Sequence, residues 1–212
     1  MKQVTQLHSQ YDELQKKYGE PTFSSIYGAG CIESPKVMFV FMNPTGRNIA
    51  GEPSWEGLRA PWIGTKQVWG IFNDLGMLDG KIYKTIKKYK AEDWSIDFSN
   101  KVYSEIEDNS VFITNLAKCT QLDARPLNNS IFRDYLNLMY KEIEIVNPKI
   151  VISFGNQVFS ILLGKNISVS NYTQNEKEIV NGYPIYPTYY PVGQGRRNMP
   201  LALERIKRVL DI

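Results

Sequence analysis

The sequence predicts an α/β fold, a three-layer sandwich in which helices flank a small, central, parallel four-stranded sheet. Four short apolar runs lack the polar alternation of half-exposed strands, as expected for parallel strands that are buried on both faces. Helical patterns separate these runs, which implies right-handed crossovers between parallel strands. A length of 212 residues suits one sizeable core. We therefore expect a single domain over residues 1–212.

The chain begins with an expected helix within residues 1–20, where apolar residues recur every three or four positions. The four expected strands are VMFVFM (37–42), VFIT (111–114), IVISF (150–154) and YPIYPT (183–188). Each run is short and apolar, and helical or turn-forming residues bound it. The strands are therefore expected to form the centre of the sheet.

The helices between the strands show the same spacing of apolar residues, together with residues that end a helix. They are expected at residues 68–75, 131–146, 157–163 and 201–210. Gly76 and Gly164 are expected to end two of them, and Asn147-Pro148 the longest. Asn198 is a candidate N-cap for the last helix, which has a proline in its first turn.

Residues 77–105 are expected to form a lysine-rich insertion before the second strand. Its clustered lysines are Lys81, Lys84, Lys87, Lys88 and Lys90. Such a run is usually a solvated face, and contact with DNA is the alternative.

Composition narrows the possible functions. The net charge of +3 permits a polyanionic partner without establishing one. The two cysteines, Cys31 and Cys119, are too few for a metal cluster, so we expect no metal and no cofactor. His8, the single histidine, lies in the expected N-terminal helix, which argues against a catalytic histidine. Without a leader or a long apolar run, the expected location is the cytoplasm.

Polar residues follow the expected strands, where ligands gather in parallel α/β sheets. Asn43 lies in an Asn-Pro turn, which either serves the turn alone or displays its amide at the sheet edge. Asn115 ends the second strand, and its planar amide either caps a turn or matches a nucleobase edge.

Two loops complete the candidate site. Trp62 lies between a proline and a glycine, where it either stacks on a planar ligand or packs into the core. Arg196 and Arg197 lie in a glycine-rich segment before the last helix, which suits either phosphate contact or exposure to solvent.

Taken in chain order, these segments resemble the uracil-DNA glycosylase superfamily, and the resemblance runs from about residue 24 to the C-terminus. Residues 42–44 (Met-Asn-Pro) resemble the first motif of its mismatch-specific and single-strand-selective branches. Residues 61–64 (Pro-Trp-Ile-Gly) are similar to the loop of the iron-sulfur branches whose aromatic ring stacks on a flipped base. Residues 114–119 (Thr-Asn-Leu-Ala-Lys-Cys) resemble the segment of those branches whose asparagine reads the base. These motifs imply that the chain has the fold of that superfamily.

The sequence also departs from the family pattern. Tyr190, in residues 190–192 (Tyr-Pro-Val), stands where the family has the histidine of its His-Pro-Ser motif. The four cluster cysteines of the iron-sulfur branches are missing except Cys119, so that cluster is expected to be absent. Asn43 replaces the carboxylate of other branches and cannot act as a strong base.

The resemblance implies a DNA glycosylase that flips and hydrolytically removes uracil or a related deaminated base, leaving an abasic site. It implies catalytic roles for Asn43 and Tyr190, base binding by Trp62, Asn115, Met42 and Pro44, and DNA contacts by Arg196, Arg197, Lys118 and Asn198. The expected partner is DNA, bound by a monomer with no membrane association, in the cytoplasm or at the nucleoid.

Two other functions stay open. A protein of this fold that binds DNA but is catalytically weak or inactive would fit the loss of the histidine. An α/β protein that handles another small ligand, such as a nucleoside, is the third possibility. No phosphate-binding glycine fingerprint follows the first strand, which argues against it.

Overall fold

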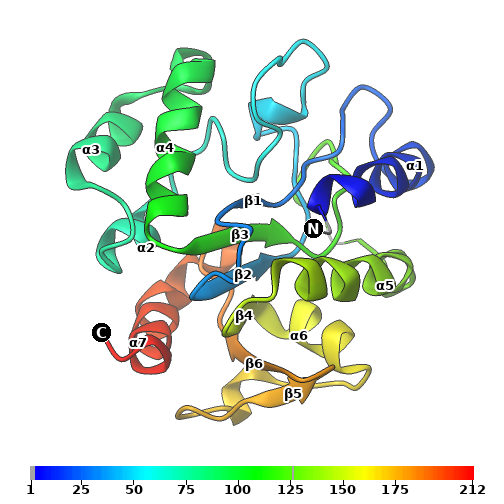
Figure 1. The fold of residues 1–212 in the computed structure, drawn as a ribbon, viewed down its shortest axis with the longest axis vertical. Helices are drawn as coiled ribbons and strands as arrows, with labels where there is room; N and C mark the ends of the chain where they lie inside the picture. Colours follow the sequence, from blue (N-terminus) through cyan, green and yellow to red (C-terminus); the bar gives the residue numbers. More distant parts are fainter. Residues whose placement is uncertain (1–2, 126) are drawn as a thin grey trace.

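The computed structural model describes residues 3–125 and 127–212; residues 1 and 2 of the expected N-terminal segment lie outside this part. Its centre is one sheet with the strand order β1-β3-β2-β4-β6-β5 (Figure 1). The four expected strands are β2 (Val37–Phe41), β3 (Val111–Asn115), β4 (Val151–Phe154) and β6 (Tyr183–Thr188). Each pairs in parallel with its neighbour among these four, which confirms the predicted α/β fold.

The sheet has six strands rather than the four expected. β1 (Ala29–Gly30) pairs antiparallel with β3 at one edge, and β5 (Glu178–Val180) pairs antiparallel with β6 at the other. These strands have two and three residues, which is too short for a recognisable hydrophobic pattern.

Helices cover both faces of the sheet (Figure 1). One face carries α2 (Trp69–Asp74), α3 (Gly80–Lys88), α4 (Ile96–Asp108) and α7 (Met199–Leu210), and the other carries α1 (His8–Tyr18), α5 (Asn129–Val146) and α6 (Gly155–Leu163). Short 3-10 helices are η1 (Val4–Leu7), η2 (Ile49–Gly51), η3 (Ala91–Asp93), η4 (Val169–Asn171) and η5 (Gly193–Asn198).

Two hydrophobic clusters occupy the two faces. In β2, Phe39 and Phe41 join the cluster under α2 and α4, while Met38 and Val40 join the cluster under α5 and α6. All five residues of β2 are buried. The strand therefore has no polar face, as predicted for a central parallel strand.

The predicted helix ends are mostly as expected. Gly76, Gly164 and Asn147 follow their helices with φ of 70°, 67° and 52°, the left-handed conformation that ends many helices. Asn198 occupies the N-cap position of α7, but its side chain makes no capping hydrogen bond.

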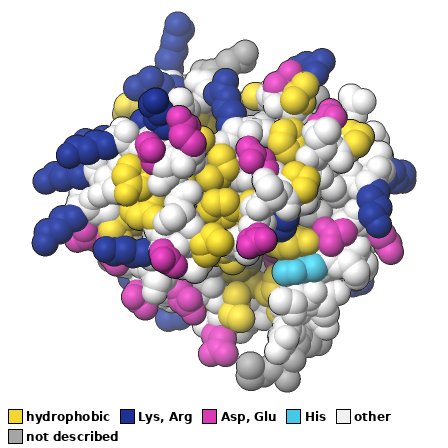
Figure 2. All heavy atoms as spheres, turned by 90° about the horizontal axis from the view of Figure 1, so that it is seen from above, with side chains coloured by type: hydrophobic (Ala, Val, Ile, Leu, Met, Phe, Trp, Pro, Cys, Tyr) yellow, Lys and Arg dark blue, Asp and Glu magenta, His cyan; other side chains and the backbone are white. Residues whose placement is uncertain are grey.

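The lysine-rich segment 77–105 forms α3, η3 and most of α4. Many of its apolar residues, including Trp94 and Tyr103, belong to the hydrophobic cluster that contains Phe39 and Phe41. Its clustered lysines are exposed, and Figure 2 shows Lys and Arg side chains gathered along the left edge, the side on which α3 lies in Figure 1.

Within the described ranges, no helix is long and apolar enough to cross a membrane.

Candidate active site

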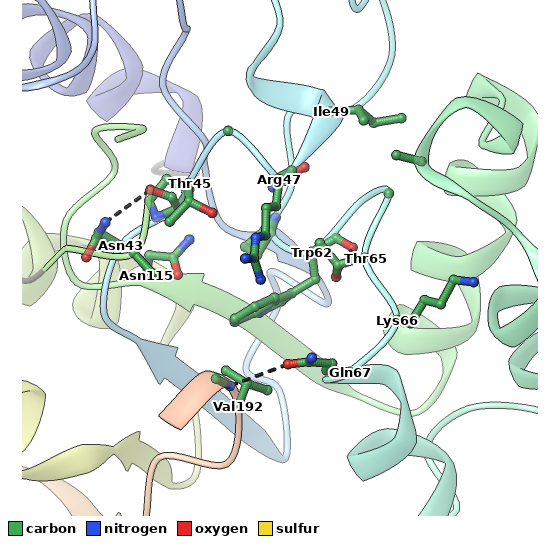
Figure 3. Close-up of a pocket in the computed structure, with 18 of the residues that line it drawn as sticks. Asn43, Thr45, Arg47, Ile49, Trp62, Thr65, Lys66, Gln67, Asn115 and Val192 are labelled. Atoms are coloured by element: carbon green, nitrogen blue, oxygen red, sulfur yellow. Dashed lines mark hydrogen bonds between the residues drawn. The ribbon is translucent and has the colours of Figure 1, made fainter. Parts of the chain in front are cut away.

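A cavity of about 620 Å³ opens where β2 and β3 end. Five of the predicted site residues line it: Asn43, Pro44, Trp62, Asn115 and Tyr190. They come from segments far apart in the sequence, and Figure 3 shows Asn43, Trp62 and Asn115 around the same space. The convergence of strand ends that the sequence implied is therefore present in the fold.

Strand pairing continues beyond the sheet and positions the two asparagines. Phe41 of β2 is in register with Asn115 of β3. Past this pair, Leu116 N donates to Phe41 O at 2.8 Å, and Ala117 N donates to Met42 O at 3.0 Å. The turns that follow β2 and β3 are thereby joined, which holds the side chains of residues 43 and 115 at one edge of the sheet.

The Asn115 amide is buried but lacks a hydrogen-bond partner for its donor. Its residue is 2% exposed, and Nδ2 has no partner among the described residues. Leaving a buried donor unpaired costs about 1–3 kcal/mol, and native proteins seldom leave one so. A donor of this kind at a cavity wall indicates a position prepared for a ligand.

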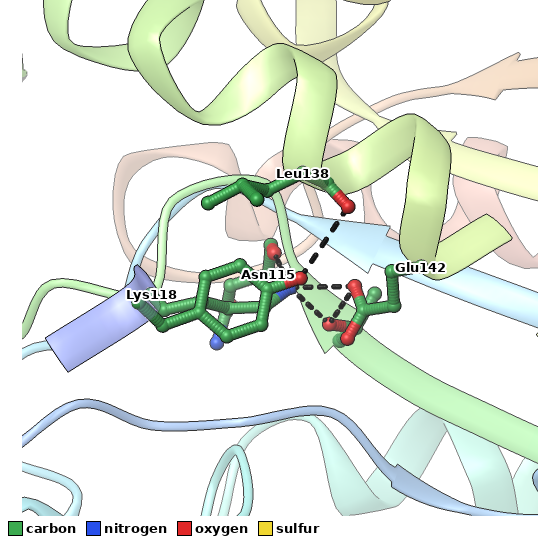
Figure 4. Close-up of polar contacts among 6 residues, drawn as sticks. Asn115, Lys118, Leu138 and Glu142 are labelled. Atoms are coloured by element: carbon green, nitrogen blue, oxygen red, sulfur yellow. Dashed lines mark hydrogen bonds and ion pairs between the residues drawn. The ribbon is translucent and has the colours of Figure 1, made fainter. Parts of the chain in front are cut away.

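Lys118 lies behind Asn115 and fixes its backbone (Figure 4). Its Nζ donates to Asn115 O at 2.5 Å and to Thr114 Oγ1 at 2.6 Å, and forms an ion pair with Glu142 Oε2 at 2.7 Å. Both side chains of the ion pair are 0% exposed. Burial lowers the pKa of the Lys118 ammonium, and the carboxylate of Glu142 opposes that shift.

The predicted DNA contact of Lys118 is therefore wrong. All three donors of its ammonium are used inside the protein, and no atom of its side chain reaches the surface. The family resemblance implied a DNA contact for this lysine, which follows the end of β3. The direction of its side chain depends on α5, which supplies Glu142 from a distant part of the chain.

Trp62 has a backbone conformation that is unusual for a bulky residue. Its φ is 69°, and a non-glycine residue in this region costs about 1–3 kcal/mol unless its surroundings impose it. The Trp62 carbonyl accepts hydrogen bonds from Thr65 N at 3.1 Å, Thr65 Oγ1 at 2.7 Å and Trp69 Nε1 at 3.2 Å. These contacts hold the residue in place.

The Trp62 ring both packs and lines the cavity. It meets Phe41 edge to face, with ring centroids 5.0 Å apart, and Phe41 stacks on Phe154 at 4.2 Å. The remaining surface of the half-buried indole borders the cavity. The two roles that the sequence allowed for this tryptophan, stacking on a ligand and packing in the core, are thus compatible.

Asn43 and Tyr190 complete the part of the site that the sequence indicated. Asn43 Nδ2 donates to Pro44 O at 3.0 Å, which directs the amide and uses one of its two donors. Burial raises the pKa of Tyr190 to about 12, so its hydroxyl stays protonated at neutral pH. The segment after Tyr190 is tied across the cavity mouth, where Gly193 N donates to Gln67 Oε1 at 3.4 Å (Figure 3).

The prediction that Met42 binds the base is wrong for its side chain. Met42 packs against the cluster under α5 and α6 and does not line the cavity. Successive side chains of a strand alternate between the two faces of a sheet. Phe41, the last residue of β2, packs in the cluster under α2 and α4, and the next residue, Met42, packs on the opposite face.

The predicted DNA contacts near the C-terminus lie outside the cavity. Arg196 and Arg197 are exposed on η5, and Asn198 ends that helix half-buried. The sequence suggested a loop here, but the segment is a 3-10 helix leading directly into α7. Their contact with DNA stays a prediction.

Several polar cavity residues escaped the prediction from sequence, among them Arg47, Thr65, Lys66 and Gln67. Arg47 follows the Asn-Pro turn by three residues, and this position after the first strand could have drawn attention to it. Thr65, Lys66 and Gln67 follow the tryptophan loop. Polar residues near a turn are common on any surface, so nothing in the sequence marks them as part of a site.

Comparison with known families confirms the family resemblance seen in the sequence. Residues 27–211 match the uracil DNA glycosylase superfamily, which is almost the whole chain. No curated protein matches the chain significantly.

Proposed function

Because the chain belongs to the uracil DNA glycosylase superfamily, whose members act on DNA, we propose that it flips and hydrolytically removes uracil or a related deaminated base, leaving an abasic site. The observation that carries this proposal is the buried, unpartnered amide of Asn115 in a cavity that it shares with the Trp62 ring. An amide and an aromatic ring are what a protein needs to read the edge of a base and hold its face.

Recognition of the base rests on Asn115 and Trp62. Asn115 Nδ2 donates to O4 of uracil, and Asn115 Oδ1 accepts from N3–H. Cytosine presents a donor in place of O4 and an acceptor in place of N3–H, so the same amide rejects it. The Trp62 ring stacks on the base, a contact worth about 1–3 kcal/mol.

Hydrolysis rests on Asn43 and Tyr190. With Nδ2 committed to Pro44 O, the Asn43 carbonyl oxygen orients the attacking water toward the sugar carbon. Tyr190 donates its hydroxyl hydrogen to O2 of the base. A single preorganised donor of this kind contributes about 100- to 1000-fold in rate. The oxocarbenium-like sugar is strongly electrophilic, so a positioned water needs no strong base.

DNA contact rests on exposed cations around the cavity. Arg196 and Arg197, together with Asn198, contact the phosphates on either side of the flipped nucleotide and offset part of the few kcal/mol that flipping costs. The protein acts as a monomer on this proposal. It acts where its DNA substrate lies, in the cytoplasm or at the nucleoid.

The test is a base-release assay on oligonucleotides that carry uracil, hypoxanthine or xanthine, single-stranded or in matched and mismatched duplexes. We expect release of at least one base, and its loss in the Asn115→Ala and Asn43→Ala variants. Asn100→Ala is the matched control, because Asn100 is exposed on α4 and does not line the cavity. If the wild-type protein releases no base from any substrate, the proposed activity is wrong.

A second candidate is a DNA-binding protein that has kept the pocket without turnover. The observation that favours it is Tyr190 in place of the family's histidine, with burial holding its pKa at about 12. Binding of uracil-containing DNA without product over long incubation would select this function. A gain of activity in Tyr190→His would support it further.

A further inference from the structure

Arg47 is an exposed cation at the cavity that makes no hydrogen bond or ion pair within the described part of the chain. It lines the cavity, and Figure 3 shows its side chain directed toward Trp62, into the space that this ring shares with Asn115. Among the residues that the structure describes, no hydrogen bond or ion pair to its guanidinium is found. A free guanidinium in a binding cavity is available for a ligand.

The backbone of Arg47 is held on both sides. Before it, Gly46 N donates to Gln121 O at 2.8 Å. After it, the Asn48 side chain, 4% exposed, donates to Ala60 O at 2.8 Å and accepts from Ala50 N at 3.1 Å. The base of the arginine side chain is thus fixed, and only its end is uncommitted.

Two other cations near the cavity donate hydrogen bonds to backbone carbonyl oxygens. Arg59 donates to the carbonyl oxygens of Ala50 at 2.9 Å and Trp55 at 3.2 Å, and so holds the loop around η2. Lys66 lines the cavity mouth, and its Nζ donates to Lys87 O at 3.0 Å.

Two further ionisable groups line the cavity. Glu52 forms no ion pair with Arg47, and its carboxylate would repel an anion. Tyr190 stays neutral because burial raises its pKa. Within the described part of the chain, Arg47 is therefore the cavity-lining cation whose side chain makes no hydrogen bond or ion pair.

We infer that Arg47 is a catalytic residue whose guanidinium contacts a carbonyl oxygen of the departing base and stabilises the negative charge that develops there. This inference rests on the proposed function. It gives the stabilisation of the departing base, the role of the family's histidine motif, to a different loop of this chain. Arginine stays charged throughout the accessible pH range. Tyr190, a neutral donor, then acts beside a full positive charge.

The step balances without a further reactant. The bond between the base nitrogen and the sugar carbon breaks, and its electron pair leaves with the base, which becomes an anion beside Arg47. The oxygen of water forms a bond to the sugar carbon and releases a proton to solvent. The base anion takes a proton from solvent on release. Charge appears on the base only as the bond breaks, so Arg47 favours the transition state over the bound substrate.

The test compares two leaving groups in single-turnover assays on matched oligonucleotides that carry uracil or 5-fluorouracil. Fluorine withdraws electrons and stabilises the base anion, so the 5-fluorouracil substrate depends less on a protein cation. We expect Arg47→Gln to slow uracil release by about 100- to 1000-fold, as for other preorganised donors, and 5-fluorouracil release far less. Arg47→Lys, which keeps the charge, should lie between the wild type and Arg47→Gln.

Arg133→Gln is the matched control, because Arg133 is exposed on α5 and does not line the cavity; it should leave both rates unchanged. An equal loss of rate with both bases, accompanied by a weaker salt dependence of DNA binding, would assign Arg47 to a phosphate and overturn the inference alone. If the wild-type protein releases neither base, the proposed function falls and the inference falls with it. The unfolding midpoint of each variant shows whether it is folded.

Discussion

The ion pair between Lys118 and Glu142 offers a direct test of how the site is held. Replacing Lys118 with methionine keeps most of the side-chain volume and removes the ammonium. It leaves Glu142 as an uncompensated buried charge, a loss that typically costs about 3–5 kcal/mol. It also removes the donor that reaches Asn115 O.

The expected loss is large for a protein of this size. Domains of this kind are stable by about 5–15 kcal/mol, so Lys118→Met should remove a substantial part of the free energy of unfolding. For 150–250 residues each kcal/mol shifts the melting temperature by about 2–4 °C, which gives a drop of about 6–20 °C. Urea unfolding followed by circular dichroism measures the free energy, and calorimetry measures the temperature.

The double variant Lys118→Met/Glu142→Leu separates charge from packing. It leaves no buried charge, so it should be more stable than Lys118→Met alone, although Thr114 loses its hydrogen bond to Glu142 at 3.1 Å. Base release should be slow in both variants, because both remove the hydrogen bond from Lys118 to Asn115 O. A cost of Lys118→Met below about 1 kcal/mol, or simple additivity of the two changes, would refute this view of the network.

Three further results are expected. Trp62→Ala should weaken binding of uracil-containing DNA by about 1–3 kcal/mol, measured by fluorescence anisotropy against undamaged DNA; equal weakening of both would argue against stacking on the base. The single-turnover rate should be flat between pH 6 and 9, because burial raises the pKa of Tyr190 to about 12 and its hydroxyl loses its proton only above that range; an inflection near pH 6.5 would point to an unassigned group. Arg196→Gln and Arg197→Gln should each lower the slope of log Kd against log salt by about one, and unchanged slopes would remove these residues from the phosphate contacts.

The sequence indicated most of the frame of this protein. β2, β3 and β4 are buried throughout, and a short apolar run marks each of the four central strands, so local sequence predicts them. Asn43 and Asn115 follow strands that must end at the same edge of a parallel sheet, so their meeting follows from the strand pattern. Trp62 was recognisable because its neighbours Pro61 and Gly64 favour a loop.

Other features depend on partners that are distant in sequence. β1 and β5 exist because the edges of the sheet offer unpaired backbone groups. Met42 faces away from the cavity because it packs against the cluster that α5 and α6 form on the other face. Neither fact can be read from the residues themselves.

By itself, the sequence determined the α/β frame, the family and the meeting of two carboxamides and an indole at the carboxyl ends of the strands. The tertiary structure decided which charged residues reach the site. Lys118 follows a strand end, but Glu142 on α5 draws it into the interior, whereas Arg47 finds no such partner and lines the cavity. The physical reason is that a buried charge needs a counter-charge or hydrogen-bond acceptors around it, and the positions of these partners are set by the packing of the whole chain.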